Sequence, residues 1–586
     1  MIIITKGGEY NMCTAEPNSI QINREKLKNL IWTGANILRD KVDYSLILLV
    51  VLYKAISDRI KYELDKYGEL LVNEELTPLR DYTWDKLLDE PDPIKRATLF
   101  KEGLYRLEKI NKSFKGLVKA YSDYLDDIDK NTEDILQLID LFAPYDFSQV
   151  QNDVIGDAYE EIIHKFALEK GKGGEVYTPK EIIELMLYII QPEPINTIYD
   201  PACGTAGMLV NAHKYLTHKY GDEAARADFY GQEINSKTAS FAMLNGYIHG
   251  IDTQKLHIKN GDTLKEPAFE DKNGNLKTFD VVIANPPWSL KRNLEESYKQ
   301  NKLKHPERFK YGFPPGNSAD WAWVQHMIAS SNGKKRIGLV IDPGMLTRGK
   351  KEFLIRKQII EDDLIESVIL LPSGLFYHSQ GLIGVIVIFN KNKTPERKGK
   401  IMFINASEYY EQHPEVRKLN RLTNIEEIAE LIHNWEEKPY VSRIVSIEEI
   451  CKEVKDAEQE ILEKQKEVQL IESRIKKIQS ETKRLKKQIK KKTKTNKEQI
   501  KKEIERLQKE KEELSKKKKQ LKSSIKIDNG CSLSVLKYVP PKPEEDNIDA
   551  VAVWEEIQEI NNKIAEHEKF ISKIVDAFFK GEDKHV

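Results

Sequence analysis

The sequence predicts an α/β fold built on a doubly wound, mostly parallel sheet, with an all-α N-terminal domain and a C-terminal coiled-coil hairpin plus helix. Two observations carry this prediction. From about residue 196, apolar strand-like runs alternate with helical patterns, which is typical of a parallel sheet covered on both faces. Residues 452–526 instead place apolar side chains three and four positions apart, the pattern of a coiled coil.

The length of 586 residues is enough for three or four domains of about 150 residues each. Hydrophobic residues make up 40% of the chain, which suffices for real cores, and the 32% of charged residues indicates long exposed helices. The net charge of -1 conceals an asymmetry, because residues 452–526 hold 27 Lys and Arg against 14 Asp and Glu. We expect a helical domain (1–150), an α/β domain (151–450), a basic hairpin (451–530) and a C-terminal segment with a partner-docking helix (531–586).

The four cysteines, Cys13, Cys203, Cys451 and Cys531, are scattered, without a CxxC pair or interleaved histidines. This spacing predicts neither a disulfide framework nor a metal site, and it fits a reducing compartment. No signal peptide is visible, and the longest apolar run, Leu46–Tyr53, is far shorter than the roughly 20 residues of a membrane helix. We therefore expect a cytoplasmic protein without a membrane partner.

Residues 1–150 are predicted to be mostly helical. Apolar residues recur at helical spacing through 27–56 and 104–141, and glycine is rare. No chemical motif is found there, so the region is interpreted as a bundle that caps or docks against another part. The true start could be Met1 or Met12.

Eight runs between residues 196 and 405 are candidate strands. They are Thr197–Tyr199, Asp228–Gln232, Leu256–Lys259, Phe279–Ala284, Arg336–Ile341, Leu364–Leu371, Ile383–Phe389 and Lys400–Asn405. Helical patterns lie between several of them, and the last strands follow one another with short polar links, which predicts an antiparallel edge. Ligands of such sheets bind at the carboxyl ends of the strands.

Residues 452–526 are predicted to form one coiled coil interrupted once, by the polar stretch 490–498. Two arms of similar length around a break predict an antiparallel hairpin, each arm roughly 40–50 Å long at about 1.5 Å per residue. A hairpin returns the chain to its start, so it can be an insertion between Ile450 and Ser532. A proline-rich linker and a final helix, Val551–Phe579, follow.

One strand exit, Phe279–Ser289 (FDVVIANPPWS), is unusual. Two consecutive prolines cannot continue a ladder, since each lacks an N–H and fixes φ. Asn285 is therefore held on a stiff backbone beside the aromatic plane of Trp288, which suits gripping the edge and face of a planar, nitrogen-bearing group. The same residues also fit an ordinary strand exit with a buried tryptophan.

Further strand ends carry residues that suit a ligand. Asp200–Gly207 (DPACGTAG) opens a helix with small residues that allow close approach to the backbone. Glu233 ends the next strand, where a carboxylate can accept from both hydroxyls of a ribose. Asp262 follows the third strand and could hold an adenine amino group. Upstream, residues 173–180 (GGEVYTPK) lead into a helix, with Thr178 as the expected N-cap. Each alone also fits a surface residue or a plain helix start, but four in register are hard to explain by chance.

In this order, the motifs resemble those of the modification (M) subunit of type I restriction–modification systems, which are S-adenosylmethionine-dependent DNA adenine N6-methyltransferases with a seven-stranded sheet. The resemblance covers about residues 20–450. It is carried by IWTGANILRDKVDYS, DAYE (157–160), GGEVYTP, DPACGTAG, GQE, GDT, ANPPW, GNSADW (316–321) and LPSGLF (371–376). The combination is specific, whereas NPPW alone is shared with other amino-group methyltransferases.

The resemblance implies a methyltransferase domain over 151–450 and a role for each motif. It places S-adenosylmethionine against Glu175, Val176, Tyr177, Thr178, Pro179, Lys180, Asp200, Thr205, Ala206 and Gly207, with Glu233 at its ribose and Asp262 at its adenine. The implied catalytic residues are Asn285, Pro286, Pro287 and Trp288. Asn285 and the Pro286 carbonyl hydrogen-bond the target amino group, Trp288 stacks on the flipped base, and Phe376 or Tyr377 lines the other face of that base. Transfer is direct, so that most of the catalytic work is positioning and electrostatics.

The chain departs from the resemblance at the hairpin. Typical members pass from a segment like SIEEI (446–450) fairly directly to one like SLSVLKYV (532–539), whereas about 80 residues intervene here. The insertion is interpreted either as a basic arm that contacts DNA phosphates or a partner subunit, or as a solvated coiled coil that serves as spacer or dimer contact.

No target-recognition domain is visible in the sequence. We therefore expect a separate specificity (S) subunit to choose the site in double-stranded DNA, and the resemblance implies two M chains per S chain and leaves room for a restriction (R) subunit. Two alternatives stay open: an amino-group methyltransferase of protein glutamine or RNA, and a non-catalytic scaffold of a DNA-defence complex.

Overall fold

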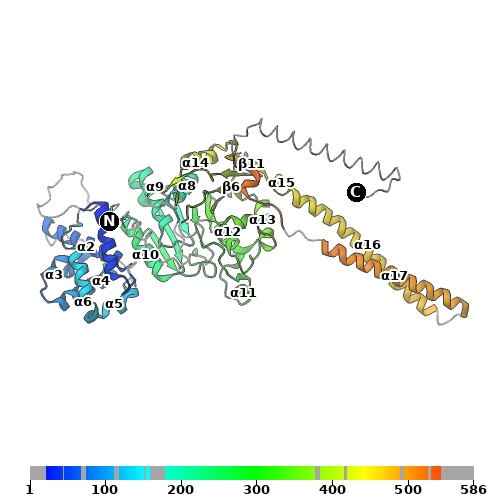
Figure 1. Cartoon of the computed structure of the whole chain (residues 1–586), viewed down its shortest axis with the longest axis horizontal. Helices are drawn as coiled ribbons and strands as arrows, with labels where there is room; N and C mark the ends of the chain where they lie inside the picture. The colour runs from blue at the N-terminus through cyan, green and yellow to red at the C-terminus, as the bar shows by residue number, and fades with distance from the viewer. Residues whose placement is uncertain are drawn as a thin grey trace, which may run out of the picture. The chain divides into compact units, whose positions relative to one another are not determined.

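The computed structural model describes residues 22–542 except 44, 68–73, 111–115, 117, 149, 151–153, 157, 159–177, 377–382, 415–418, 489–493 and 525–528 (Figure 1). The chain divides into two compact units, Met1–Val539 and Pro540–Val586. Almost all of the second unit, including the predicted helix 551–579, lies outside the described residues. The motif residue Asp157 lies outside them as well.

The N-terminal region is helical where it is described. Its α-helices are α1 (Arg24–Leu38), α2 (Leu46–Tyr67), α3 (Trp84–Asp89), α4 (Pro93–Ile110), α5 (Ser122–Asp126) and α6 (Ile128–Phe142). Asn23 caps α1 by accepting from the Lys26 N–H at 2.9 Å. The helices pack around Trp84, whose ring meets Phe100 and Phe142 edge-on. Within the described residues, no helix combines the length and the apolar character needed to cross a membrane.

The α/β region is built on one nine-stranded sheet with the order β11-β8-β6-β7-β5-β4-β1-β2-β3. The strands are β1 (Thr197–Asp200), β2 (Asp228–Glu233), β3 (Leu256–Asn260), β4 (Val281–Ala284), β5 (Ile337–Ile341), β6 (Ile365–Leu370), β7 (Val385–Phe389), β8 (Lys400–Asn405) and β11 (Ser442–Ser446). A separate ribbon pairs β9 (Tyr410–Gln412) with β10 (Asn420–Leu422). The mostly parallel α/β sheet is thus confirmed.

Two details of the predicted sheet were wrong. The sheet has nine strands rather than seven, because β8 pairs in parallel with β6 and β11 then adds to β8. The antiparallel direction is not confined to the edge either. Strand β7 lies antiparallel between β5 and β6, inside the sheet, since the chain leaves β6 and turns back into the space next to β5.

Side chains that alternate along the strands separate the two faces of the sheet. Ile198 and Ile283 belong to a core shared with helices α8 (Lys180–Ile190), α9 (Gly207–Tyr220) and α14 (Ile425–Asn434). Their neighbours Tyr199 and Val282 belong to a second core shared with α12 (Asp320–Ala329) and α13 (Lys351–Glu361). Burial on both faces explains why these strands appear in the sequence as continuous apolar runs.

Four parallel strands, β3, β2, β1 and β4, lie side by side in that order. Their carboxyl ends therefore meet at one edge of the sheet, and the segments that follow them can contribute to a single site. Helix α10 (Ser236–Ile248) follows β2, and its apolar residues Phe241, Leu244 and Ile248 pack into the same core as the N-terminal helices.

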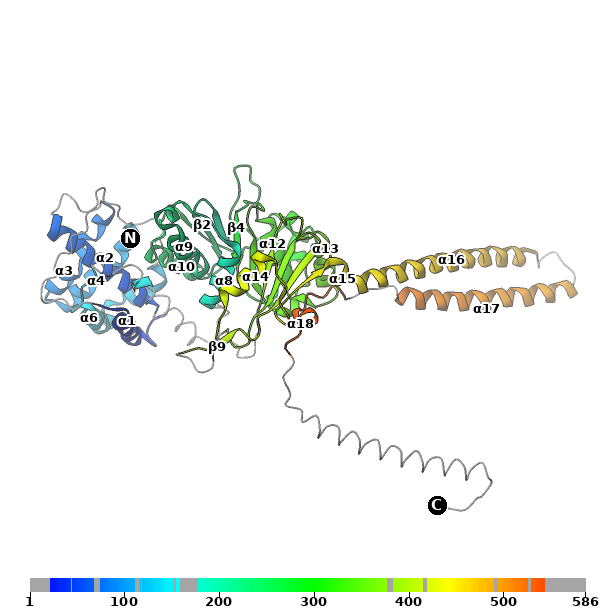
Figure 2. The same ribbon diagram turned by 90° about the horizontal axis from the view of Figure 1, so that it is seen from above.

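The coiled-coil region forms a pair of helices, α16 (Lys452–Gln488) and α17 (Lys494–Ser524), which lie side by side (Figure 2). Ion pairs between Lys517 and Glu467 and between Arg474 and Glu510 cross from one helix to the other. From Glu467 to Arg474 the chain advances along α16, whereas their partners go back from Lys517 to Glu510 along α17, so the two helices run antiparallel.

A disulfide joins Cys451 and Cys531 at the base of the hairpin, with their Cα atoms 4.6 Å apart. The prediction of no disulfide was wrong for this pair. The two cysteines are 80 residues apart in the sequence, and they meet only because the hairpin returns the chain to its start. A short α-helix, α18 (Val535–Tyr538), follows and packs on the sheet. The ring centroids of Tyr538 and of Phe403 in β8 are 4.3 Å apart.

Candidate functional site

Asn285 directly follows the buried strand β4, and its side-chain amide is fixed at both ends. Its Nδ2 donates to Thr178 Oγ1 at 2.8 Å, and its Oδ1 accepts from Trp288 Nε1 at 2.9 Å. The amide oxygen has two lone pairs, so that one of them remains available to a ligand. Among the described residues, no group donates to the carbonyl of the adjacent Pro286. Two acceptor oxygens therefore belong to consecutive residues at this strand end.

The Thr178 hydroxyl is taken up by Asn285 and does not cap the following helix. Helix α8 begins after Pro179, which makes no side-chain capping bond, so the predicted N-cap role of Thr178 was wrong. Asn285 competes for the same hydroxyl and gains a hydrogen bond in a buried place. Lys180 points along the helix to Glu184, at 3.3 Å. The other three residues predicted in this segment, 175–177, lie outside the described residues.

Trp288 is half-buried and meets the ring of Phe376 edge-on, with 4.9 Å between the ring centroids and 72° between the planes. Gly384 allows this approach, because a Cβ there would lie 2.6 Å from Phe376 and 3.2 Å from Trp288. A base sandwiched between two rings needs roughly 7 Å, twice a carbon–carbon contact of about 3.5 Å. In this arrangement Phe376 supports Trp288 and does not face it across a base. The alternative residue, Tyr377, lies outside the described residues.

The loop after β1 leaves open space in front of its backbone. Gly204 has a φ of +52°, and an added Cβ there, or at Gly207, would meet nothing within 4 Å. Ala206 adopts the left-handed conformation, at φ 65°, as the N-cap of α9. The Thr205 carbonyl accepts from Asn245 Nδ2 at 2.8 Å, which anchors the loop to α10. A ligand can therefore approach this loop closely.

Asp200, at the end of β1, is almost fully buried and accepts from the Ala202 N–H at 2.9 Å. Burial raises the pKa of its carboxyl to about 7, against the hydrogen bond from Ala202, and the neighbouring carboxylate of Glu233 adds to the increase. Glu233 Oε2 in turn accepts from the Gly204 N–H at 3.2 Å. The structure thus brings the ends of β1 and β2 together, as predicted.

Asp262 follows β3 and joins the same group of loops. Its Oδ1 accepts from the Leu264 N–H at 3.1 Å, and its Oδ2 lies 3.7 Å from Arg292 Nε. The adjacent Thr263 donates from Oγ1 to the Pro201 carbonyl at 2.6 Å, which ties the loop after β3 to the loop after β1. Three strand ends are therefore linked by hydrogen bonds of their own residues.

A buried arginine that the sequence did not single out supports the loop after β3. Arg308 donates to the Thr263 carbonyl and to His326 Nδ1, both at 2.8 Å. His326 Nε2 lies 3.1 Å from the Tyr199 hydroxyl. Burial, with the Arg308 charge beside it, holds the pKa of His326 well below its usual value, so that His326 is neutral and can accept from Arg308.

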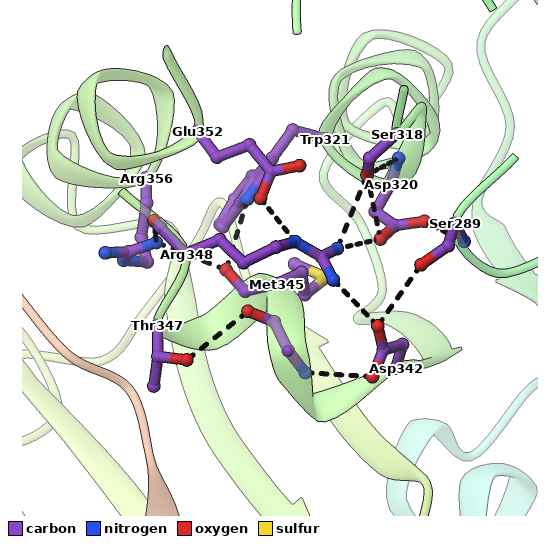
Figure 3. Close-up of polar contacts among 11 residues, drawn as sticks. Ser289, Ser318, Asp320, Trp321, Asp342, Met345, Thr347, Arg348, Glu352 and Arg356 are labelled. Carbon is purple, nitrogen blue, oxygen red and sulfur yellow. Dashed lines mark hydrogen bonds and ion pairs between the residues drawn. The ribbon is translucent and has the colours of Figure 1, made fainter. Parts of the chain in front are cut away.

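A second arginine holds the segment that follows the Asn-Pro-Pro-Trp sequence (Figure 3). Arg348 donates to Asp342 at 2.8 Å and to Glu352 at 2.6 Å, and it also forms an ion pair with buried Asp320. Two of these carboxylates reach Ser289: its N–H donates to Asp320 at 2.7 Å, and its hydroxyl donates to Asp342 at 3.3 Å. Asp342 follows the buried strand β5, so a strand-end carboxylate was the signal that could have found it.

The same network reaches the base of the hairpin through Arg356, which is fully buried. Arg356 donates to the carbonyls of Arg348 and Gly530 at 2.8 Å and to that of Cys531 at 3.0 Å. Four well-placed hydrogen bonds, including one to Met345 at 3.2 Å, satisfy most donors of this buried guanidinium. The segment that closes the hairpin is therefore part of the support of the Ser289 loop.

Comparison with known proteins identifies the family of the chain. A family model described as N-6 DNA Methylase matches residues 150–460, more than half of the chain. The chain belongs to this family. It is 39% identical over 463 residues to the type I restriction enzyme MjaVIII methylase subunit of Methanocaldococcus jannaschii, a match that covers 74% of the chain and 77% of the relative. The HindI methylase subunit of Haemophilus influenzae is 31% identical over 352 residues, which is 58% of the chain and 75% of the relative.

Solved structures support the same fold for this N-6 DNA methylase. The methyltransferase subunit of a type I restriction–modification system from Streptococcus thermophilus matches with a TM-score of 0.62 at 24% identity, over 74% of the chain and 98% of that structure. A modification subunit from Vibrio vulnificus matches with a TM-score of 0.51 at 16% identity, over 75% of the chain and 94% of that structure. The predicted resemblance is thus confirmed, and with it the activity class, adenine-specific DNA methyltransferase.

Proposed function

We propose that this N-6 DNA methylase transfers the methyl group of S-adenosylmethionine to N6 of an adenine that a separate specificity subunit selects in double-stranded DNA. The observation that carries the proposal is the doubly fixed amide of Asn285 at the end of β4. Strand β4 is followed in the sheet by β1, β2 and β3. The carboxyl ends of these three strands are linked by hydrogen bonds, and they offer an open loop and carboxylates to a nucleoside.

The donor set fits S-adenosylmethionine, the methyl donor of this class of enzyme. The open space in front of Gly204 and Gly207 leaves room for a ligand against the backbone. One carboxylate oxygen of Glu233 accepts from the Gly204 N–H and the other accepts from the Asn235 N–H, which fixes this carboxylate at the end of β2 beside the open loop. The Glu233 carboxylate is assigned to the ribose hydroxyls. Asp262 is assigned to the cofactor adenine. When bound, S-adenosylmethionine supplies an electrophilic methyl group on its sulfonium.

The residues after β4 are assigned to the target base. Asn285 Oδ1 and the Pro286 carbonyl accept hydrogen bonds from the exocyclic amino group, which draws the nitrogen lone pair out of conjugation with the ring. The hydrogen bonds from Trp288 and to Thr178 fix the direction of the Asn285 amide, so little reorganisation is needed when the base enters. Pro287 keeps the backbone stiff between the two acceptors and Trp288.

The target base must leave the duplex before it can reach these acceptors, at a cost of a few kcal/mol. Trp288 is assigned to stack on the flipped base, which returns part of that energy. Phe376 is assigned a supporting role, because it packs edge-on against Trp288 at 4.9 Å. The remaining catalytic work is positioning, because no covalent intermediate is required.

The choice of site is assigned to partners. The relatives are named methylase subunits of type I restriction enzymes, which supports work within a larger complex. We infer one specificity subunit, a second methylase chain and, in a restriction-competent form, a restriction subunit. The C-terminal segment 531–586 is assigned to docking on these partners.

A methyl-acceptor assay tests the proposal against its two alternatives. The purified complex is incubated with labelled S-adenosylmethionine and, in parallel, with plasmid DNA, RNA or a protein extract. Label recovered as N6-methyladenine in DNA is expected. Label in RNA or in protein glutamine, or cofactor binding without transfer to any acceptor, would contradict it.

A further inference from the structure

The positive charge of the hairpin is concentrated at its far end. Residues 476–502, around the turn, contain 12 Lys and 1 Arg against 2 Glu. The other residues of 452–526 contain 14 Lys and Arg against 12 Asp and Glu, and are therefore almost balanced. An exposed coiled coil that serves only as a spacer needs no such separation, because mixed charges along its whole length keep it solvated.

The balanced part of the hairpin uses its charges to join the two helices. Lys517 pairs with Glu467 at 2.7 Å, and Lys518 pairs with Glu472 at 2.9 Å. Arg474, just before the cationic end, pairs with Glu510 at 2.8 Å. These are the pairs expected of residues that flank a coiled-coil seam. These ion pairs can fix the register of the two helices, so the distal charges are not needed for it.

The distal cations have no such partners among the described residues. Eight of them are described and exposed: Lys476, Lys477, Lys483, Arg484, Lys486, Lys487, Lys501 and Lys502. No ion pair to a carboxylate exists for any of the eight within the described part of the chain. Like charges this dense repel one another, and a polyanion that lies against them would relieve this repulsion. We call these eight residues the distal cationic cluster.

We propose that the distal cationic cluster binds the phosphate backbone of double-stranded DNA without reading its sequence. Residues 476–487 extend about 16 Å along the helix, and B-DNA carries about one charge per 1.7 Å, so several phosphates fall within reach. Lysine dominates the cluster, and lysine is a point charge that suits phosphates better than the bidentate reading of base edges.

The composition of the hairpin argues against other polyanions. Residues 452–526 contain no Phe, Tyr or Trp, so they offer no ring on which the bases of a single strand could stack. Apolar residues of the seam, such as Ile471, Ile478 and Ile504, are buried between the helices. Leu470 is exposed, but one leucine does not make the apolar face with which a helix enters a lipid headgroup region. This proposal goes beyond the methyl-transfer site and does not depend on it.

Charge-neutralised variants of the full chain test the proposal. In the distal variant, Lys476, Lys477, Lys483, Lys486 and Lys487 are changed to Gln. In the matched control, five exposed or half-buried lysines nearer the base, Lys466, Lys509, Lys511, Lys516 and Lys519, are changed to Gln. Both variants lose the same net charge, and glutamine keeps the helix propensity of lysine. Circular dichroism checks that both retain the coiled coil.

Binding of a non-specific DNA duplex is followed by fluorescence anisotropy as a function of salt concentration. The distal variant is expected to bind at least about tenfold more weakly at low salt. Its slope of log K against log salt is expected to become shallower by about 0.9 for each phosphate that the variant no longer neutralises. The control is expected to stay within a factor of about 2 or 3 of the parent chain.

Three results would overturn the proposal. The first is an unchanged affinity and salt slope in the distal variant, and the second is an equal loss in both variants, which would indicate a general charge effect. The third is a distal variant that binds DNA like the parent chain but binds an RNA duplex or phosphatidylserine vesicles, measured in parallel, more weakly. The test needs no methyl transfer, so its failure can be told apart from a failure at Asn285.

Discussion

Asn285 owes its suitability for catalysis to the two side chains that fix it. An amide that can rotate presents its oxygen and its nitrogen to a ligand in turn, whereas here Thr178 accepts from the nitrogen and Trp288 donates to the oxygen. Reversing the amide would place its NH2 group against the Trp288 N–H, which can only donate, and would lose that bond, whereas the Thr178 hydroxyl can donate as well as accept. The oxygen is therefore aimed before the base arrives.

Replacing Asn285 with Ala is expected to lower the rate of methyl transfer by at least about 100-fold, as for the loss of one preorganised polar group in an active site. Binding of S-adenosylmethionine, measured by calorimetry, should be largely retained, because the loops after β1, β2 and β3 do not depend on Asn285, although Thr178 loses one hydrogen bond. Asn390→Ala is the matched control, since Asn390 follows the antiparallel strand β7 and so lies at the other edge of the sheet. Unchanged single-turnover rates in Asn285→Ala would remove Asn285 from the mechanism.

Asp200 makes the stability of the cofactor-free protein depend on pH. Its folded pKa is raised to about 7, so its stabilising contribution is full below its unfolded pKa of about 4 and is lost as pH rises through about 7. Asp200→Asn has no carboxyl to ionise and so does not lose this stability. The free energy of unfolding of Asp200→Asn minus that of the parent should therefore increase by up to about 4 kcal/mol from pH 4 to pH 8. Urea unfolding at several pH values measures the difference.

Asp280 provides a control of opposite sign. Burial opposes its ionisation, but hydrogen bonds from Thr197, Asn332 and Lys334 outweigh burial and lower the pKa of its carboxyl to about 2. Its contribution is present above about pH 4 and is lost only as pH falls through about 2. Asp280→Asn should therefore be destabilised equally at pH 5 and pH 8, and a pH trend like that of Asp200→Asn would contradict both assignments.

At the scale of elements, the apolar runs predicted, within a few residues, the eight strands that the structure describes up to residue 405. Such runs are visible in the sequence because the strands are buried on both faces. The place of β7 between β5 and β6 could not be predicted, since its direction depends on pairing between strands and not on its own composition. The strand ends predicted the meeting of Asp200, Glu233 and Asp262, but not the contact of Asn285 with Thr178, which lies 107 residues away.

The arginine networks could not be predicted from the sequence either. Arg308 and Arg348 sit in segments without a recognisable motif, and only the fold shows that they are buried against carbonyls and carboxylates. The disulfide shows the same limit, because spacing rules detect local pairs of cysteines and the hairpin makes a distant pair local.

The Arg348 network joins three elements around the Ser289 loop, so a change there should affect catalysis more than cofactor binding. Arg348→Lys keeps the charge but cannot bridge Asp320, Asp342 and Glu352 at once. Methyl transfer is expected to slow by about 10- to 100-fold, because the Trp288 loop is misplaced, with calorimetric binding of S-adenosylmethionine unchanged. Arg443→Lys, in an exposed pair with Glu449, is the control. Equal effects of the two substitutions on the rate of methyl transfer would contradict a specific role of the Arg348 network in placing the Trp288 loop.

On the scale of the whole molecule, the base of the hairpin is anchored, and we predict that the rest of the hairpin is an insertion that the fold does not need. Cys451, Val454, Cys531 and Leu533 belong to the core of the α/β region, so the base must stay. Replacing residues 461–519 with a short Gly/Ser turn should leave cofactor binding and thermal stability close to those of the parent. A collapse of either would show that the hairpin is part of the fold.

The central claim is that this chain methylates an adenine which another subunit selects. The most direct measurement maps N6-methyladenine at single-nucleotide resolution in plasmid DNA treated with the purified chain, with and without its specificity subunit. Methylation of one defined site only when the specificity subunit is present is the predicted result. Robust methylation of a defined site by the chain alone would contradict the claim.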